Sequence, residues 1–72
     1  MDVEETRKLK WARPFRAFAL IVQDGRRFPV DHPDYLALDP AAESVTIFEK
    51  ESNFAETIDI FAVVSARHEV AA

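Results

Sequence analysis

The pair Asp24-Gly25 lies between two apolar segments and constrains the fold more than any other feature of this chain. The residues from Arg16 to Gln23 are typical of a strand, and apolar alternation restarts at Phe28. Asp-Gly between two such segments is a strong signal for a β-hairpin. The sequence therefore predicts an antiparallel hairpin that ends near Val30.

Two turn geometries are compatible with this hairpin, and they give different registers. A type I turn followed by a left-handed Gly25 bulge pairs Leu20 with Phe28, whereas a two-residue loop pairs Ile21 with Phe28. We favour the bulge because it gathers the larger side chains on one face. Both alternating sets of the first strand are apolar, so we expect both of its faces to be covered. The expected core residues are Phe18, Leu20, Val22, Phe28 and Val30.

The first residues have the pattern of a short helix. Asp2 is suited to the N-cap, and Glu5 follows three residues later, as in a capping box. Pro14 disfavours helical geometry at the residue before it and ends the helix. Trp11 falls on the side opposite the apolar stripe, so we expect its side chain to be exposed.

The remainder of the chain consists of short apolar segments separated by polar or proline-containing turns. Strands are expected at about 35–38, 45–48, 54–58 and 63–70, with a break at His32-Pro33-Asp34. Helical crossovers of the length that parallel strands need are absent. The predicted fold is mainly β (α+β): a helix at about 2–12, then an antiparallel barrel of about five to six strands at about 15–70, in one domain spanning 1–72.

Composition narrows the range of functions. The chain has 72 residues and no cysteine, which excludes disulfides and thiolate zinc sites. A core this small is usually only marginally stable, so we expect association between subunits. No apolar run approaches the ~20 residues of a membrane helix, and the acidic start is unlike a signal peptide. We therefore expect a soluble cytoplasmic protein with no membrane partner.

Charge is distributed unevenly along the chain. Up to Arg27 there are seven basic and four acidic residues, whereas the residues after it include two basic and nine acidic ones. Such polarity favours contact between unlike faces of two copies, or contact of the basic part with a polyanion. The candidate interaction surface consists of Arg7, Lys10, Trp11, Arg13, Arg16, Arg26 and Arg27.

No residue pattern indicates catalysis or a bound cofactor. His32 and His68 are the only histidines, too few for a protein-ligated metal site, and Pro33 makes a turn or capping role natural for His32. The carboxylates are typical of a solvated face, and the single glycine, Gly25, excludes a glycine-rich phosphate loop. We expect no enzymatic activity, no cofactor and no metal.

Three segments carry a resemblance to known proteins: Ala12 to Phe18, Asp24 to Phe28, and His32 to Tyr35. They resemble a family of short uncharacterised bacterial proteins, whose pattern is Ala-Arg-Pro-Phe-Arg-x-Phe, then Asp-Gly-Arg-x-Phe, then a His-Pro segment with an aromatic residue. More remotely, the helix followed by short strands is similar to Sm-like and SH3-like small barrels. The residues with which Sm-like proteins contact RNA bases have no matching positions here.

Two functions from different classes are therefore compatible with the chain. The favoured hypothesis is a small interaction module that associates with itself or docks a protein partner through strand edges. The alternative is a barrel that binds nucleic acid through the basic N-terminal part, with Trp11 or Phe15 as a stacking surface. Salt-dependent retention on single-stranded nucleic acid would distinguish the two.

Overall fold

The computed structural model describes residues 1–68, which form one α-helix, six strands and two short 3₁₀ helices. In chain order these elements are α1 (Val3–Lys10), β1 (Phe18–Val22), β2 (Arg27–Val30), η1 (Pro33–Tyr35), β3 (Leu36–Asp39), β4 (Ser44–Phe48), β5 (Ala55–Asp59), η2 (Ile60–Ala62) and β6 (Val63–His68). The predicted mainly β fold with an N-terminal helix is confirmed. The last two residues predicted for the final strand, 69 and 70, lie outside the described residues.

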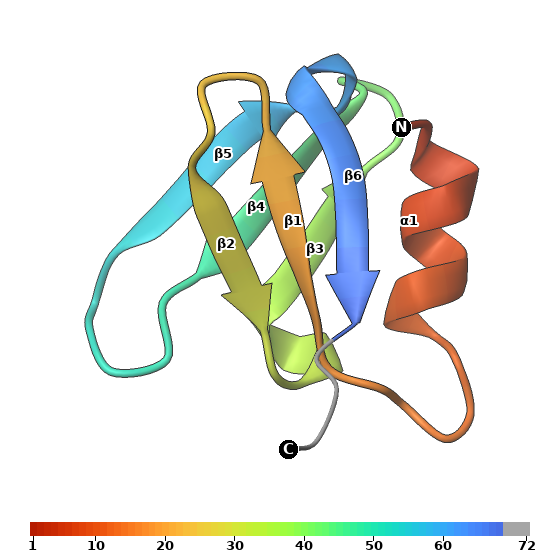
Figure 1. The fold of residues 1–72 in the computed structure, drawn as a ribbon, viewed down its shortest axis with the longest axis vertical. Helices are drawn as coiled ribbons and strands as arrows, with labels where there is room; N and C mark the ends of the chain where they lie inside the picture. Colours follow the sequence, from red (N-terminus) through yellow and green to blue (C-terminus); the bar gives the residue numbers. More distant parts are fainter. Residues whose placement is uncertain (69–72) are drawn as a thin grey trace.

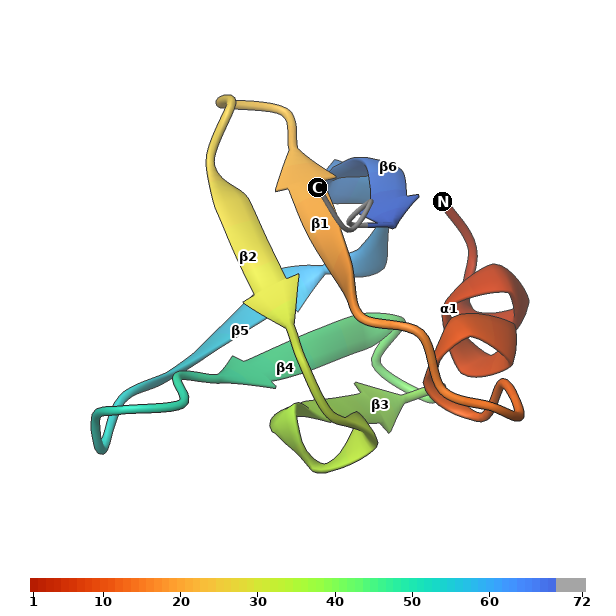
Figure 2. The same ribbon diagram turned by 60° about the horizontal axis from the view of Figure 1, so that its bottom comes forward.

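The strands form two antiparallel sheets, with the orders β2-β1-β6 and β3-β4-β5. Figures 1 and 2 show them as two layers that cross obliquely. The predicted antiparallel strands are confirmed, but they do not close into a barrel, because no strand pairing joins the two sheets among residues 1–68. The physical reason lies at His32-Pro33-Asp34, where η1 interrupts the chain between β2 and β3. A continuous bent strand that would belong to both sheets is therefore not formed.

The β1–β2 hairpin has the predicted bulge register. Leu20 lies opposite Phe28, and Phe18 lies opposite Val30. The N–H of Gly25 donates to the carbonyl of Val22 at 2.9 Å, and Gly25 has a φ of 91°. A type I turn with a glycine bulge makes these contacts, so the alternative two-residue loop is excluded.

The core lies between the inner faces of the two sheets. Phe18, Leu20, Val22 and Val30 are buried, whereas Phe28 is only partly buried and packs at the margin. The β3-β4-β5 sheet contributes the buried aliphatic side chains of Leu36, Val45 and Ile47, and Ile60 of η2 and Val63 at the start of β6 are buried as well. Ala19, on the outer face of β1, is also buried.

Helix α1 covers one side of the two-sheet structure, next to β6 (Figure 1). It is shorter than predicted and ends at Lys10, with exposed Trp11 as its C-cap. The side chain of Asp2 accepts from the Glu5 N–H at 2.8 Å, as predicted for the N-cap. The N-terminal ammonium of Met1 donates to the Val63 carbonyl at 3.0 Å, and this bond attaches the start of the chain to β6.

The core analysis predicts unequal effects for two truncations in the hairpin. Leu20→Ala is expected to lower the free energy of unfolding by ~2–5 kcal/mol, because it leaves a cavity in a fully buried position. Phe28→Ala is expected to cost less, because this side chain is partly solvated. Urea unfolding followed by circular dichroism measures both, and an equal or larger loss for Phe28→Ala would contradict this description of the core.

The turn geometry predicts a purely conformational effect at Gly25. A Cβ at this position would have no atom within 4 Å, but the backbone φ of 91° disfavours any L-residue. Gly25→Val is therefore expected to destabilise the fold by ~1–2 kcal/mol or more, the cost of left-handed backbone. Gly25→Asn should cost less, because asparagine visits positive φ more readily. Equal melting temperatures of the valine variant and the wild type would contradict the turn assignment.

Candidate functional site

The candidate interaction surface predicted from sequence does not form one patch of unengaged cations. Arg7 pairs with Glu4 at 2.7 Å on the helix. Lys10 donates to the carbonyls of Pro33 (2.8 Å) and Leu36, so its ammonium fastens the end of α1 to η1 and β3. Both side chains therefore have structural roles.

The remaining members of that surface lie in different surroundings. Trp11 is 62% exposed, and the Lys10 ammonium lies 4.9 Å from its ring centroid. Arg13 and Arg16 are exposed in the segment between α1 and β1. Arg27 is exposed on β2. The residues of the candidate interaction surface are close in sequence, but in the structure they lie in different surroundings.

Arg26 joins the two sheets on the side of the molecule away from α1. Its Nε donates to Asp24 Oδ2 at 2.7 Å, and its Nη1 lies 3.0 and 2.9 Å from the two carboxylate oxygens of Glu56 on β5. Its guanidinium also lies 5.2 Å from the ring centroid of Phe28. Because these groups are exposed, the two ion pairs of Arg26 contribute little to stability. Their effect is to orient the Arg26 side chain between Asp24 and Glu56.

Phe28, whose ring the Arg26 guanidinium approaches, also lines a cleft of about 250 Å³. Four segments provide its lining: β2, the turn after it, η1, and the end of β4 with the following turn. Its apolar and aromatic lining residues are Phe28, Pro29, Tyr35, Ile47 and Phe48. Sequence reasoning missed this site because its walls come from segments that are distant in the chain.

The rim of the cleft carries both signs of charge. Arg27 and Lys50 are cationic, and Asp31 and Glu49 are anionic. Lys50 Nζ lies 4.0 Å from Asp31 Oδ2, across the gap between the β2–η1 connection and the β4–β5 turn. An apolar floor with a mixed charged rim has the general character of a protein-binding surface.

Phe54 lies on the β4–β5 hairpin and is the backbone partner of Glu49, a residue that lines the cleft. Its carbonyl accepts from the Glu49 N–H at 3.0 Å, which continues the strand pairing past Phe48 and Ala55. Since strand residues alternate, Phe54 belongs to the same face of the hairpin as Glu56 and Ile47. Its side chain is 75% exposed, more than any other large hydrophobic side chain among residues 1–68. In the sequence, Phe48 and Phe54 lie on either side of a charged turn. This spacing is the signal from which the exposed aromatic side chains could have been predicted.

The two strand edges that border this side are poorly suited to pairing with another strand. Pro29 lies in the edge strand β2 and has no N–H to donate. Glu56, in the edge strand β5, lies opposite the buried Ile47, so its charge is on the inner face of the sheet. Edge prolines and inward charges both oppose the addition of strands. Side chains in the cleft are therefore better placed to bind a partner than the backbone edges.

The histidines have local structural contacts. His32 Nδ1 accepts from the Asp34 N–H at 3.1 Å and caps η1, in agreement with its predicted turn role. His68 Nδ1 lies 3.3 Å from the Ala17 carbonyl oxygen, and its ring packs edge-on against Phe18. Within residues 1–68, no group of three His, Cys, Asp or Glu residues has an arrangement that could hold a metal ion.

No helix within the described residues is long and apolar enough to cross a membrane. Comparison with known proteins gives no further assignment: no protein-family model, no curated protein and no solved structure matches the chain.

The Arg26 contacts predict the titration of Asp24. Hydrogen bonds from the backbone N–H and the guanidinium of Arg26 lower the pKa of Asp24 below its ordinary value. Any stability from this pair is present above the unfolded-state pKa and is lost as the pH falls through the lowered folded-state pKa. Arg26→Ala is expected to raise the Asp24 pKa only part of the way, because the backbone N–H remains.

Carboxyl-detected NMR titration of Asp24 measures this effect. Glu56→Gln is the control, because it alters the other partner of Arg26 and leaves both hydrogen bonds to Asp24 in place. An Asp24 pKa that is unchanged by Arg26→Ala would contradict the side-chain contribution.

Proposed function

We propose that this protein is a non-enzymatic interaction module that binds a second copy of itself through the aromatic cleft. In the proposed dimer, Phe54 of each copy enters the cleft of the other. The observation that carries the proposal is that Phe54, the most exposed large hydrophobic side chain among residues 1–68, is paired through its backbone with Glu49, which lines the apolar hollow.

The size of the cleft supports this occupant. A cavity of ~150 Å³ is large enough to hold benzene, so a hollow of about 250 Å³ has room for one phenyl ring. The ring would contact Phe28, Tyr35 and Phe48, and aromatic pairs contribute ~0.5–1.5 kcal/mol beyond the burial of their area. The apolar area of Phe54, now in water, would be removed from it.

Two-fold symmetry supports a second copy over an unrelated partner. When a protruding residue and its receiving hollow are adjacent on one face, a two-fold axis satisfies both at once. The mixed charge of the rim is self-complementary under the same operation, since Lys50 of one copy can approach Glu49 of the other. Exposed charges of this kind orient the contact and contribute little affinity.

The small core supports association as well. A domain of this length rarely gains more than ~3–5 kcal/mol from one hydrophobic core, and burial between subunits is a common supplement. Contact through inserted side chains also agrees with the blocked edges, because it does not require a strand to pair with β2 or β5. The proposal therefore retains self-association and moves the contact from the strand edges to the side chains of the cleft.

We propose that the two sheets are an opened version of the SH3-like and Sm-like small barrels; pairing of the first strand, β1, with the last, β6, supports this. The relationship to short bacterial proteins, and a cytoplasmic location, rest on the sequence patterns alone.

Mass in solution tests the proposed dimer. Light scattering coupled to size exclusion, over a series of protein concentrations, is expected to show the wild type passing from monomer to dimer. Phe54→Ala is expected to remain monomeric over the same series, because it removes the inserted ring. High salt should have little effect, because apolar contact and not exposed charge drives the association.

The matched control is Phe61→Ala. Phe61 is also a highly exposed phenylalanine, at 60%, but it lies on η2 and does not line the cleft. This variant should dimerise like the wild type. A monomeric wild type, or equal dimerisation of the Phe54 and Phe61 variants, would contradict the proposal, as would a dimer that dissociates in high salt.

A further inference from the structure

A second surface lies where α1 ends and the chain turns toward β1. Trp11, the C-cap of α1, is 62% exposed and is the only tryptophan in the chain. The Lys10 ammonium lies over its ring, 4.9 Å from the centroid. That ammonium also donates to the carbonyls of Pro33 and Leu36, which fix it on the body of the protein. The indole is therefore held from one side by an anchored cation, while most of its surface faces solvent.

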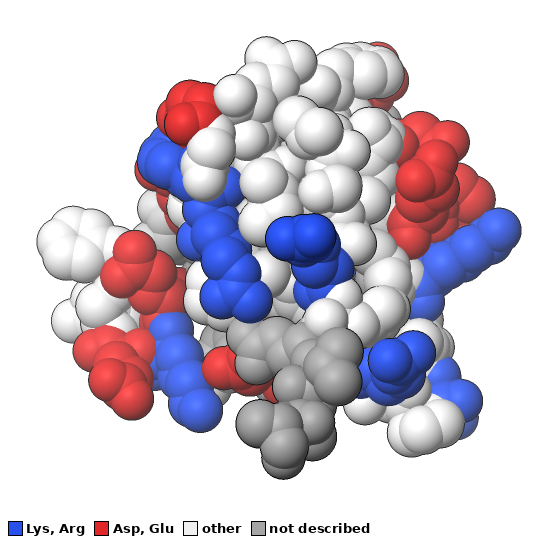
Figure 3. Space-filling model, viewed as in Figure 1, with Lys and Arg blue, Asp and Glu red and all other residues white. Residues whose placement is uncertain are grey.

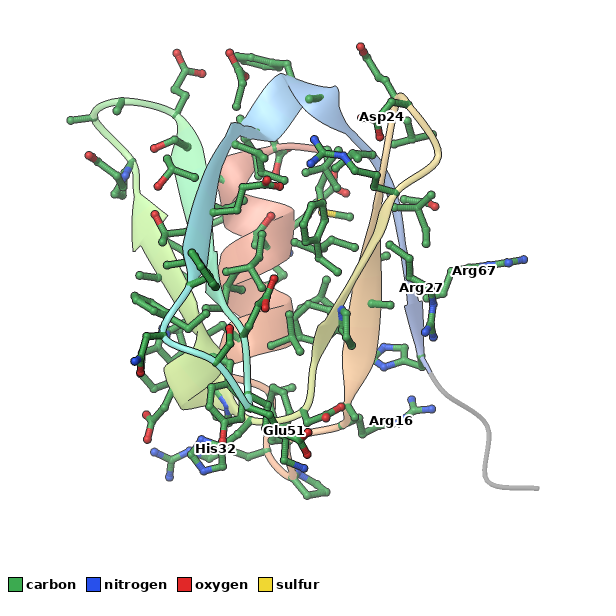
Figure 4. All side chains as sticks on the ribbon, turned by 90° about the vertical axis from the view of Figure 1, so that its left-hand side faces the viewer. Arg16, Asp24, Arg27, His32, Glu51 and Arg67 are labelled. Carbon is green, nitrogen blue, oxygen red and sulfur yellow. The ribbon has the colours of Figure 1, made fainter. Side chains whose placement is uncertain are left out.

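Two cations without ion pairs follow Trp11 in the chain. Arg13 and Arg16 are exposed, and neither side chain forms an ion pair within residues 1–68. An extended chain spans at most ~3.6 Å per residue, so their Cα atoms lie within ~7 and ~18 Å of that of Trp11. Figure 3 shows red side chains beside the start of α1 and blue ones beside its end. Figure 4 shows the Arg16 side chain just before β1, directed away from the two sheets.

We propose that Trp11, Arg13 and Arg16 bind single-stranded nucleic acid. A base stacks on the exposed face of Trp11, and the two arginines contact the adjacent phosphates. Aromatic rings beside cations bind single strands in this way without reading their sequence, because every base has a π-face. The guanidinium suits the phosphate contact, because its planar fork of donors matches phosphate oxygens.

Phe15, the other aromatic residue of this segment, does not provide the stacking surface. Its ring lies 5.9 Å from that of Phe18 and 6.5 Å from that of His32, between centroids, and it packs against the hydrophobic core. Of the two aromatic side chains that the sequence offers for stacking, Trp11 is therefore the available one.

The composition of this surface favours nucleic acid over a membrane or an acidic peptide. Helices that bind a membrane interface use a broad apolar face. Among residues 1–68, every exposed large hydrophobic side chain other than Trp11 comes from β4 or a later segment. An acidic peptide could pair with the arginines but offers no base to stack. This proposal does not depend on the dimer, because Trp11, Arg13 and Arg16 do not line the cleft.

The single tryptophan makes the stacking directly measurable. Oligothymidylate added to the protein at low salt is expected to quench the Trp11 emission, because a stacked base lies against the indole. Fluorescence anisotropy of labelled oligothymidylate measures the affinity, and two phosphate contacts predict a slope of about −1.4 for log K against log salt, at ~0.7 per contact. Absence of binding at low salt would overturn the proposal, as would binding that leaves the emission unchanged.

Two kinds of variant separate stacking from charge. Trp11→Ala is expected to weaken binding by about 5- to 150-fold, the effect of losing one stacked base, with an unchanged salt slope. Trp11→Phe should recover most of that affinity. Arg13→Ala and Arg16→Ala should each make the slope shallower by ~0.7. Wild-type affinity of Trp11→Ala, or a wild-type slope of both arginine variants, would overturn the proposal.

The matched controls lie elsewhere on the molecule. Arg26→Ala removes an arginine whose partner, Asp24, lies at the opposite end of β1 from Arg16 (Figure 4). Phe61→Ala removes an aromatic side chain that is 60% exposed. Both variants should keep the wild-type affinity and slope, and losses equal to those of the Arg13 and Trp11 variants would overturn the proposal.

Two competitors test the chemical class of the partner. Polyglutamate of equal charge should displace the oligonucleotide poorly, and displacement as effective as by unlabelled oligothymidylate would overturn the proposal. Vesicles of anionic lipid should leave the Trp11 emission unshifted, and a blue shift with vesicles in place of quenching by oligothymidylate would also overturn it. Since Trp11→Ala should not alter the mass measured by light scattering, failure here is distinguishable from failure of the dimer.

Discussion

Apolar contact between the inner faces of two short sheets holds this molecule together, because no strand ladder crosses from one sheet to the other within residues 1–68. Fully buried side chains from both sheets, such as Leu20 and Val45, form the shared layer. Two openings result where the sheets meet without pairing. Helix α1 covers one of them. There the Lys10 ammonium donates to the Pro33 carbonyl, and the N-terminal ammonium donates to the Val63 carbonyl. At the other, the Arg26–Glu56 ion pair connects the two sheets.

This arrangement explains why the candidate binding surfaces lie where they do. The β4–β5 turn lies on the side of the molecule opposite α1 in both ribbon views (Figures 1 and 2). Pro29 and Glu56 oppose the addition of a further strand to the edges of β2 and β5. The apolar side chains of Phe48 and Phe54 nevertheless remain exposed on the β4–β5 hairpin. A surface with blocked backbone edges and an exposed Phe54 favours recognition through side chains.

Local signals in the sequence predicted local structure well. Asp24-Gly25 fixed the hairpin register, since only a residue tolerant of positive φ suits the bulge, and Asp2 fixed the start of the helix. The sequence predicted the break at His32-Pro33-Asp34 but not the division into two sheets, because that division depends on which strands pair across long distances in the chain. The cleft was not foreseen because four separate segments line it. Lys10, expected on a binding surface, is instead drawn to the carbonyls of Pro33 and Leu36, a contact between residues more than twenty positions apart.

The most direct test of the central claim, that the aromatic cleft is the site of self-association, is to follow backbone amide shifts by NMR while the wild-type protein is diluted. The account predicts that the shifts which change on dilution belong to the cleft and its hairpin, at Phe28, Tyr35 and 48–54, and that those of α1 stay constant. Changes confined to α1 or to the outer face of the β2-β1-β6 sheet, or shifts independent of concentration, would contradict it.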